Sequence, residues 1–145
     1  MIAVAPLREA QIAAAAALEA RCFSDGVSAA ALREFVLAEA NHYYAAAADG
    51  EICGYGGFSL AADEAEILTV AVAPPYRRRG IARALMERML ADAAAQGGTV
   101  MYLDVRASNE AARALYEALG FAETGVRRNY YTRPREDAVL MKRAL

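Results

Sequence analysis

A single glycine stands between an apolar run and a helical pattern near the middle of this 145-residue chain, and this junction limits the possible folds. The apolar run ends at Val72, Gly80 follows a short polar stretch, and from Ile81 onward apolar residues recur every three or four positions. A short apolar run predicts a buried strand, whereas the helical spacing predicts an amphipathic helix. The chain therefore contains a strand–loop–helix unit, which is typical of α/β folds.

The loop of this unit is suited to holding a phosphate. Glycine lets the backbone approach a ligand, the small Ala82 leaves room beside it, and a helix start offers unpaired N–H groups. Three arginines, Arg77, Arg78 and Arg79, add positive charge at the same point. No G-K-[S/T] follows and no second glycine completes G-x-G-x-x-G, which disfavours nucleoside triphosphate and dinucleotide loops. The alternative is that Gly80 only starts a helix and that the arginines form a solvated turn.

The remaining patterns predict one α/β domain over residues 1–145, because no repeat or low-complexity linker divides the chain. We expect helices over residues 9–21, 28–40, 80–96 and 108–120, with Ser28 as an N-cap. We expect strands over residues 2–7, 42–48, 51–60, 64–72, 99–105, 123–128 and 138–143. The order β-α-α-β-β-β-α-β-α-β-β predicts a mixed sheet of about seven strands flanked by about four helices.

Composition narrows the classes of function. Cys22 and Cys53 lack metal-binding spacing and His42 is the only histidine, so we expect reduced thiols and no metal. The chain lacks a run of about 18 apolar residues and a basic leader, which predicts a cytoplasmic protein without a membrane span. Residues 1–72 are acidic and residues 73–145 are basic, which suits an anionic cofactor. Acids interrupt the basic residues, which disfavours direct binding to nucleic acid.

Several motifs resemble those of a known enzyme family. The loop reads R-x-x-G-x-A at 77–82, and further motifs are D-V-R-A-S-N at 104–109, A-L-Y-E at 114–117, L-G-F at 119–121, R-R-N-Y-Y at 127–131 and R-E-D-A at 135–138. Together with the order of elements, they resemble the GCN5-related N-acetyltransferases (GNAT superfamily), and within them the bacterial ribosomal-protein-alanine N-acetyltransferases, the RimI group. The resemblance covers roughly residues 60–143 and implies the GNAT fold.

The resemblance also implies acetyl-CoA as cosubstrate and a set of residues that hold it. The loop would bind the pyrophosphate, a strand backbone would pair with the pantetheine amides, and Tyr116 would return a proton to the departing thiolate. The implied cosubstrate-binding residues are Val70, Ala71, Val72, Arg77, Arg78, Arg79, Gly80, Ile81, Ala82, Arg83, Asn109 and Tyr116. Tyr116 could instead be a core aromatic residue, and Asn109 could simply cap a helix.

Two carboxylates compete for the role of general base. The resemblance places the base at Asp104, where the family commonly has Glu, so the side chain here is one methylene shorter. A shortfall of this kind can lower the rate about a hundredfold unless a water molecule bridges the gap. Glu66 is the rival candidate. Alternatively, either side chain faces solvent or pairs with an arginine.

The sequence departs from the RimI group at residues that would influence the choice of acceptor. An α-amine with a pKa near 8 is neutral far more often at pH 7 than a lysine with a pKa near 10.4, so it needs a weaker base. The resemblance implies the N-terminal alanine of a ribosomal protein. However, Gly26 and Val27 stand where the group usually has Pro-Trp, and the chain contains no Trp.

This departure leaves other acceptors and another class of protein open. The loop at 23–29 would border the acceptor groove, and Tyr130 and Tyr131 could line the peptide path. One alternative is an N-acetyltransferase for a small-molecule amine or a lysine. Another is a non-catalytic acyl-CoA-binding or sensing module. The sequence does not indicate an oligomeric state.

Overall fold

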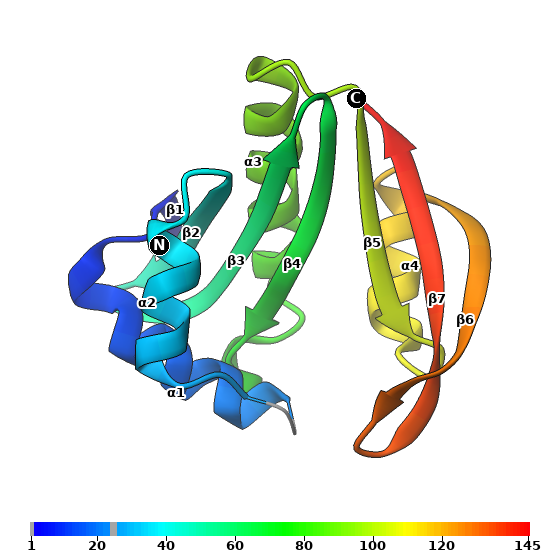
Figure 1. Cartoon of the computed structure of the whole chain (residues 1–145). Coiled ribbons are helices and arrows are strands. Elements are labelled where there is room, and N and C mark those ends of the chain that lie inside the picture. Colours follow the sequence, from blue (N-terminus) through cyan, green and yellow to red (C-terminus); the bar gives the residue numbers. More distant parts are fainter. Residues whose placement is uncertain (1, 24–25) are drawn as a thin grey trace.

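The computed structural model describes residues 2–23 and 26–145, and these residues form a seven-stranded sheet with helices on both faces (Figure 1). The strands are β1 (Ile2–Pro6), β2 (Asn41–Ala48), β3 (Glu51–Ala61), β4 (Glu64–Val72), β5 (Val100–Arg106), β6 (Ala122–Thr132) and β7 (Arg135–Ala144). The helices are α1 (Ile12–Cys22), α2 (Ala29–Leu37), α3 (Ile81–Ala95) and α4 (Glu110–Ala118), with short 3₁₀ turns η1 (Glu9–Gln11) and η2 (Pro74–Tyr76). The predicted order of elements is confirmed.

The sheet opens between its two central strands. Its order is β1-β2-β3-β4-β5-β7-β6, and every neighbouring pair is antiparallel except β4 and β5, which are parallel. β4 and β5 pair only over residues 64–66 and 100–102. Beyond this short ladder the two strands diverge, as Figure 1 shows. The second half of β4 therefore has a backbone edge that faces an opening instead of a neighbouring strand.

The helices cover the two halves of the sheet differently. α1 and α2 lie on one side of the β1–β4 half, whereas α3 lies on the opposite side of that half and α4 lies on the same side as α3 behind β5 and β7 (Figure 1). One core packs α3 and α4 against the sheet around Phe58, Leu85, Met89 and Met101. A second, smaller core packs α1 and α2 against the sheet.

Local chemistry explains where the helices begin and end. The Ser28 hydroxyl accepts a hydrogen bond from the amide of Ala31 at 3.1 Å, which confirms the predicted N-cap of α2. The helix ends at Leu37, three residues before the predicted end, because Ala38 already has extended backbone angles (φ −66°, ψ 129°). α3 and α4 are followed by glycines with positive φ, 93° and 96°, as expected for left-handed helix ends.

The last hairpin is longer than predicted. The sequence pattern predicts strands at 123–128 and 138–143, whereas the structure pairs β6 and β7 up to Thr132 and Arg135. The pairing register shifts between Arg127 and Tyr131. Within this irregular stretch Asn129 has a φ of 53°, and its amide donates to a carboxylate oxygen of Asp137 at 2.8 Å. Polar side chains therefore extend the hairpin where apolar alternation has ended.

Candidate active site

The divergence of β4 and β5 creates a cavity of about 560 Å³ between the two halves of the sheet. Four residues of the sequence-predicted site line it, namely Val70, Asp104, Asn109 and Tyr116. The other lining residues come from α1, β4, β5 and the β6–β7 hairpin and are Glu19, Cys22, Phe23, Ile67, Leu68, Thr69, Val105, Arg106, Tyr131, Arg133 and Pro134. The fold thus brings residues from five elements to a single opening.

The loop before α3 contains two residues with positive φ. Gly80 has a φ of 77° and Arg78 a φ of 64°, so the chain turns back sharply before the helix. Among the described residues, none accepts a backbone hydrogen bond from the amides of residues 78–83. These donors therefore stay available at the positive end of a helix dipole, an arrangement that favours an anion.

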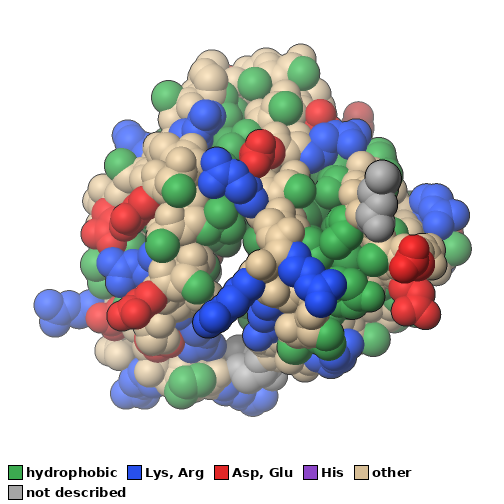
Figure 2. All heavy atoms as spheres, turned by 180° about the vertical axis from the view of Figure 1, so that it is seen from behind, with side chains coloured by type: hydrophobic (Ala, Val, Ile, Leu, Met, Phe, Trp, Pro, Cys, Tyr) green, Lys and Arg blue, Asp and Glu red, His purple; other side chains and the backbone are tan. Residues whose placement is uncertain are grey.

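Side chains add positive charge around this loop. The face that carries α3 and α4 shows Lys and Arg side chains gathered around a hollow between the two halves of the sheet (Figure 2). Within the loop, Arg77 donates through Nε to the Val72 carbonyl at 3.2 Å, and the Arg79 guanidinium lies 5.3 Å from the Tyr76 ring centroid. Arg83, which the resemblance includes in the cosubstrate set, pairs with Glu87 at 3.0 Å on the helix surface.

The edge of β4 next to the cavity leaves backbone groups available to a ligand. Val70, Ala71 and Val72 pair with Gly56, Tyr55 and Gly54 of β3 along one edge. Their other edge faces the opening, because β5 pairs with β4 only at residues 64–66. An extended arm that carries amides fits such an edge as an added strand, so the predicted contact with pantetheine is geometrically possible.

Asp104 and Tyr116 belong to one electrostatic cluster. Tyr116 is buried, with its ring edge-on to Phe121 at 5.9 Å between centroids. Burial and the negative charge of Asp104 raise the pKa of Tyr116 to about 12. The same carboxylate charge, followed by burial, raises the pKa of Tyr130. Asp104 therefore lies close enough to both phenols to influence their protonation.

Glu66 lies outside this cavity in the part of the chain that the structure describes. It is exposed on β4 at the end of the short ladder, where its backbone lies opposite Tyr102 of β5. Its charge contributes to the raised pKa of Tyr130, but only as the smallest of the causes. The geometry thus places Asp104, and not Glu66, on the cavity wall with Tyr116.

Glu19 of α1 is a cavity residue that sequence reasoning missed. Its carboxylate accepts hydrogen bonds from the Tyr55 hydroxyl at 2.5 Å, the Thr69 hydroxyl at 3.0 Å and the Val27 amide at 3.2 Å. Together with burial, which is the larger cause, Glu19 raises the pKa of Tyr43 to about 12. Glu19 stands in an alanine-rich helix, and its partners on β3 and β4 are remote in sequence. No local pattern therefore pointed to it.

The predicted acceptor loop is described only in part, since Ser24 and Asp25 lie outside the described residues. Phe23 lines the cavity with 41% of its surface exposed. A Cβ on Gly26 would approach the Cα of Ala20 to 2.9 Å, so this position does not accept a larger residue without a backbone shift.

Asn109 is the last of the sequence-predicted residues on the cavity wall. Asn109 caps α4, because its side-chain oxygen accepts a hydrogen bond from the Ala112 amide at 3.2 Å, and it lines the cavity as well.

In the described part of the chain, no cluster of three or more His, Cys, Asp or Glu side chains could hold a metal ion. None of the described helices is long and apolar enough to cross a membrane.

The chain belongs to the acetyltransferase (GNAT) family, whose model matches residues 12–121. Members of this family use acetyl-CoA, which agrees with the unpaired amides of the loop before α3 and with the open edge of β4. The family resemblance and the fold predicted from the sequence are both confirmed.

Two relatives and one solved structure with assigned functions show which members of the family this chain is similar to. The chain is 38% identical to the N-alpha-acetyltransferase RimI of Mycobacterium tuberculosis, with 98% of this chain and 92% of that protein covered. It is 44% identical over 95 residues to the [ribosomal protein bS18]-alanine N-acetyltransferase of Escherichia coli, a match that spans 64% of either chain. The crystal structure of the ribosomal-protein-S18-alanine N-acetyltransferase from Escherichia coli superposes with a TM-score of 0.91 at 34% identity, covering 99% of this chain and 94% of that one.

Proposed function

We propose that this chain is an acetyl-CoA-dependent N-acetyltransferase that acetylates the α-amine at the N-terminus of a protein, with a ribosomal protein that begins with alanine as the leading acceptor. The observation that carries the proposal is the end-to-end similarity to an N-alpha-acetyltransferase, combined with a cavity that holds Asp104 and Tyr116 at the sheet opening. Residues 1–145 would act as one domain, in the cytoplasm where ribosomal proteins are made.

The proposed chemistry is a direct attack of the acceptor amine on the thioester. The amine nitrogen forms a bond to the acetyl carbon, the carbon–sulfur bond breaks, the amine gives up a proton and the thiolate gains one. The Asp104 carboxylate would take the amine proton, directly or through a water molecule, and the Tyr116 hydroxyl would protonate the thiolate. The backbone of Val70–Val72 and the loop at 77–82 would hold the cosubstrate while this occurs.

Two peptides test the acceptor. One has a free N-terminal alanine and no lysine, and the other has a blocked N-terminus and an internal lysine. After incubation with acetyl-CoA, mass spectrometry should show one added acetyl group on the first peptide only. Acetylation of the lysine alone would move the assignment to a lysine acetyltransferase. If neither peptide reacts although acetyl-CoA binds, a small-molecule acceptor or a sensing module becomes the better assignment.

The base assignment predicts different outcomes for the two candidate carboxylates. We expect Asp104→Asn to lower kcat/KM for the peptide by about tenfold or more, because general-base catalysis is lost. Glu66→Gln should stay within about twofold, because surface charges away from the reacting atoms act weakly. Steady-state kinetics on both variants checks this, and the reverse ranking would assign the base to Glu66.

The dependence of the rate on pH follows from the pKa values of the acceptor amine and of Tyr116. The α-amine must be neutral, so kcat/KM should rise about tenfold per pH unit below a pKa near 8 and then level off. Because the pKa of Tyr116 is raised to about 12, the phenol keeps its proton, and we expect no falling limb up to pH 10. A profile from pH 6 to 10, measured with protein whose folding is checked at each pH, tests this. A decline between pH 9 and 10 would mean that an essential acid loses its proton in that range, which does not fit Tyr116 with a pKa of about 12.

A further inference from the structure

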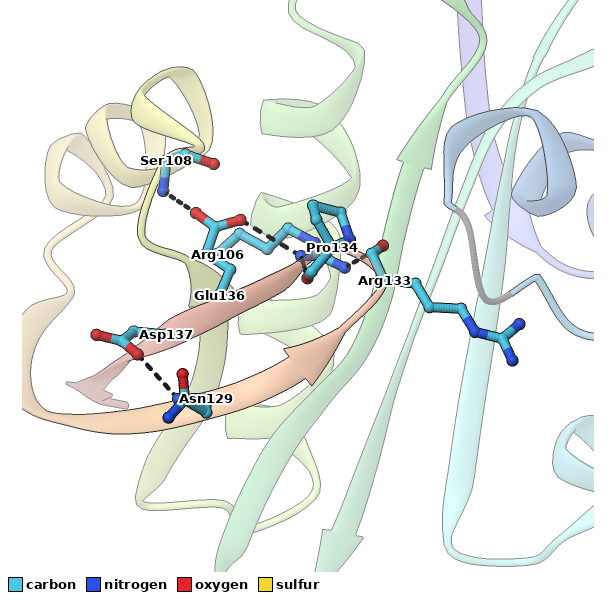
Figure 3. Close-up of polar contacts among 7 residues, drawn as sticks. All are labelled: Arg106, Ser108, Asn129, Arg133, Pro134, Glu136 and Asp137. Carbon is cyan, nitrogen blue, oxygen red and sulfur yellow. Dashed lines mark hydrogen bonds and ion pairs between the residues drawn. The ribbon is translucent and has the colours of Figure 1, made fainter.

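One side chain of β5 holds the turn between β6 and β7 over the cavity. Arg106 donates through Nη1 to the Pro134 carbonyl at 3.0 Å and through Nη2 to the Arg133 carbonyl at 3.1 Å (Figure 3). Both carbonyl-bearing residues line the cavity. A planar guanidinium can reach two neighbouring carbonyls at once, which an ammonium cannot do with the same geometry.

A carboxylate of β7 completes this attachment. Glu136 accepts from Arg106 Nη1 at 3.3 Å through one oxygen and from the Ser108 amide at 2.5 Å through the other (Figure 3). These hydrogen bonds, with the nearby guanidinium, lower the pKa of Glu136, so the group stays ionised at neutral pH. Ser108 precedes Asn109, the N-cap of the helix that carries Tyr116. The turn is therefore tied both to β5 and to the start of α4.

The same guanidinium positions an aromatic ring of the cavity wall. It lies 4.3 Å from the centroid of the Tyr131 ring, within the range of cation–π attraction. Tyr131 lines the cavity from β6, whereas Glu19 lines it from α1 on the other half of the sheet (Figure 1). The Asn129 amide donates a hydrogen bond to Asp137 (Figure 3). This bond joins β6 to β7 within the hairpin and does not involve Arg106. The β5–β7 ladder ends at the pair Arg106 and Ala138, and beyond it Arg106 attaches the turn to the strand that carries Asp104.

We propose that Arg106 is a positioning residue that sets the affinity for a polypeptide acceptor. By holding the β6–β7 turn against β5, it keeps Tyr131, Arg133 and Pro134 as a rigid wall, so that an acceptor chain enters a preformed passage between this wall and α1. Preorganised walls improve binding because no ordering is needed when the ligand arrives. The inference rests on the proposed function, and its role in acceptor binding goes beyond the chemistry assigned to Asp104 and Tyr116.

The test compares two arginines that make similar contacts. In the variant Arg106→Gln the two-carbonyl link and the ring contact are lost, whereas Arg106→Lys keeps the charge without the planar fork. The matched control is Arg113→Gln, because Arg113 also binds a carbonyl, that of Ala107 at 2.9 Å, and a carboxylate of β6, that of Glu123 at 2.6 Å. Arg113 does not line the cavity.

Two readouts are measured on each full-length variant. Hydrogen exchange by mass spectrometry reports the opening of residues 128–137, and the exchange of β1–β4 in the same sample reports whether the variant is folded. Steady-state kinetics reports KM for the free-alanine peptide, KM for acetyl-CoA and kcat. For Arg106→Gln we expect exchange in 128–137 to be about tenfold faster and the peptide KM to rise about tenfold, with the KM for acetyl-CoA within about twofold. Arg106→Lys should fall between Arg106→Gln and wild type.

Each outcome bears on the proposal. Arg113→Gln should resemble wild type in the exchange of 128–137 and in the peptide KM. Unchanged exchange in Arg106→Gln, faster exchange without a higher peptide KM, or an equal effect of Arg113→Gln would overturn the positioning role. A failure of the proposed function looks different, because wild-type protein would then acetylate no peptide terminus at all, and the inference would fall with it.

Discussion

Replacing Tyr116 by Phe should lower kcat about a hundredfold while leaving acetyl-CoA affinity and thermal stability nearly unchanged. The substitution removes only the hydroxyl. Among the described residues, none accepts a hydrogen bond from that hydroxyl. The ring would keep its packing against Phe121. Acetyl-transfer kinetics, calorimetric titration with acetyl-CoA and thermal unfolding together measure the three quantities.

The raised pKa of Tyr116 limits the size of this effect. A phenol with a pKa of about 12 is a weak acid toward a thiolate whose conjugate acid has a pKa near 8.5, so complete proton transfer is uphill. Part of the rise comes from the negative charge of Asp104. If Asp104 takes the amine proton, that charge disappears and the pKa of Tyr116 falls. Base and acid would then act in sequence, with the first proton transfer preparing the second.

A second tyrosine gives the matched control for this prediction. Tyr44 donates through its hydroxyl to Asp92 of α3 at 2.6 Å, and neither residue lines the cavity. Tyr44→Phe should therefore lower the unfolding temperature, since it breaks an internal hydrogen bond to a charged group, and leave kcat within about twofold. If Tyr116→Phe keeps wild-type kcat, another group protonates the thiolate. If it also loses as much stability as Tyr44→Phe, the hydroxyl of Tyr116 has a structural role.

The features that sequence reasoning predicted well are those set by neighbouring residues. Ser28 and Asn109 have the side chains that cap helices, and both do so in the structure. Gly80 lies at a strand–helix junction, where its positive φ is the conformation that glycine adopts without strain. The strands predicted over 42–48 and 51–60 leave only Asp49 and Gly50 between them, and both residues have the positive φ that a tight hairpin requires.

The features that sequence reasoning missed depend on contacts between distant residues. Glu19 enters the site only because Tyr55 and Thr69, which lie 36 and 50 positions further along the chain, donate hydrogen bonds to it. The β6–β7 turn is bonded to Arg106 of β5, which lies nearly thirty positions earlier in the chain. A pattern of alternation or helical spacing carries no information on such pairs, so neither feature has a local signature.

Replacing Gly80 by Val should abolish measurable acetyl-CoA binding, with a loss of affinity of roughly 10²- to 10⁴-fold. A left-handed conformation is strained for a residue with a side chain by about 1–2 kcal/mol, and a β-branched residue is the least tolerant. The loop would relax to another backbone conformation, and the unpaired amides of residues 78–83 would change direction. Each lost hydrogen bond to a charged phosphate contributes about 1.5–3 kcal/mol, so the loss of two accounts for the expected range.

The glycine at the other end of the same helix separates strain from binding. Gly97 has a φ of 93°, and a Cβ there meets nothing within 4 Å, as at Gly80 with its φ of 77°. Gly97→Val should therefore lose comparable stability in thermal unfolding while binding acetyl-CoA like wild type. Gly80→Asn should recover part of the affinity, because Asn tolerates the left-handed region. Full affinity in Gly80→Val would contradict the phosphate-binding role, because the loop would then hold no group that depends on its backbone conformation.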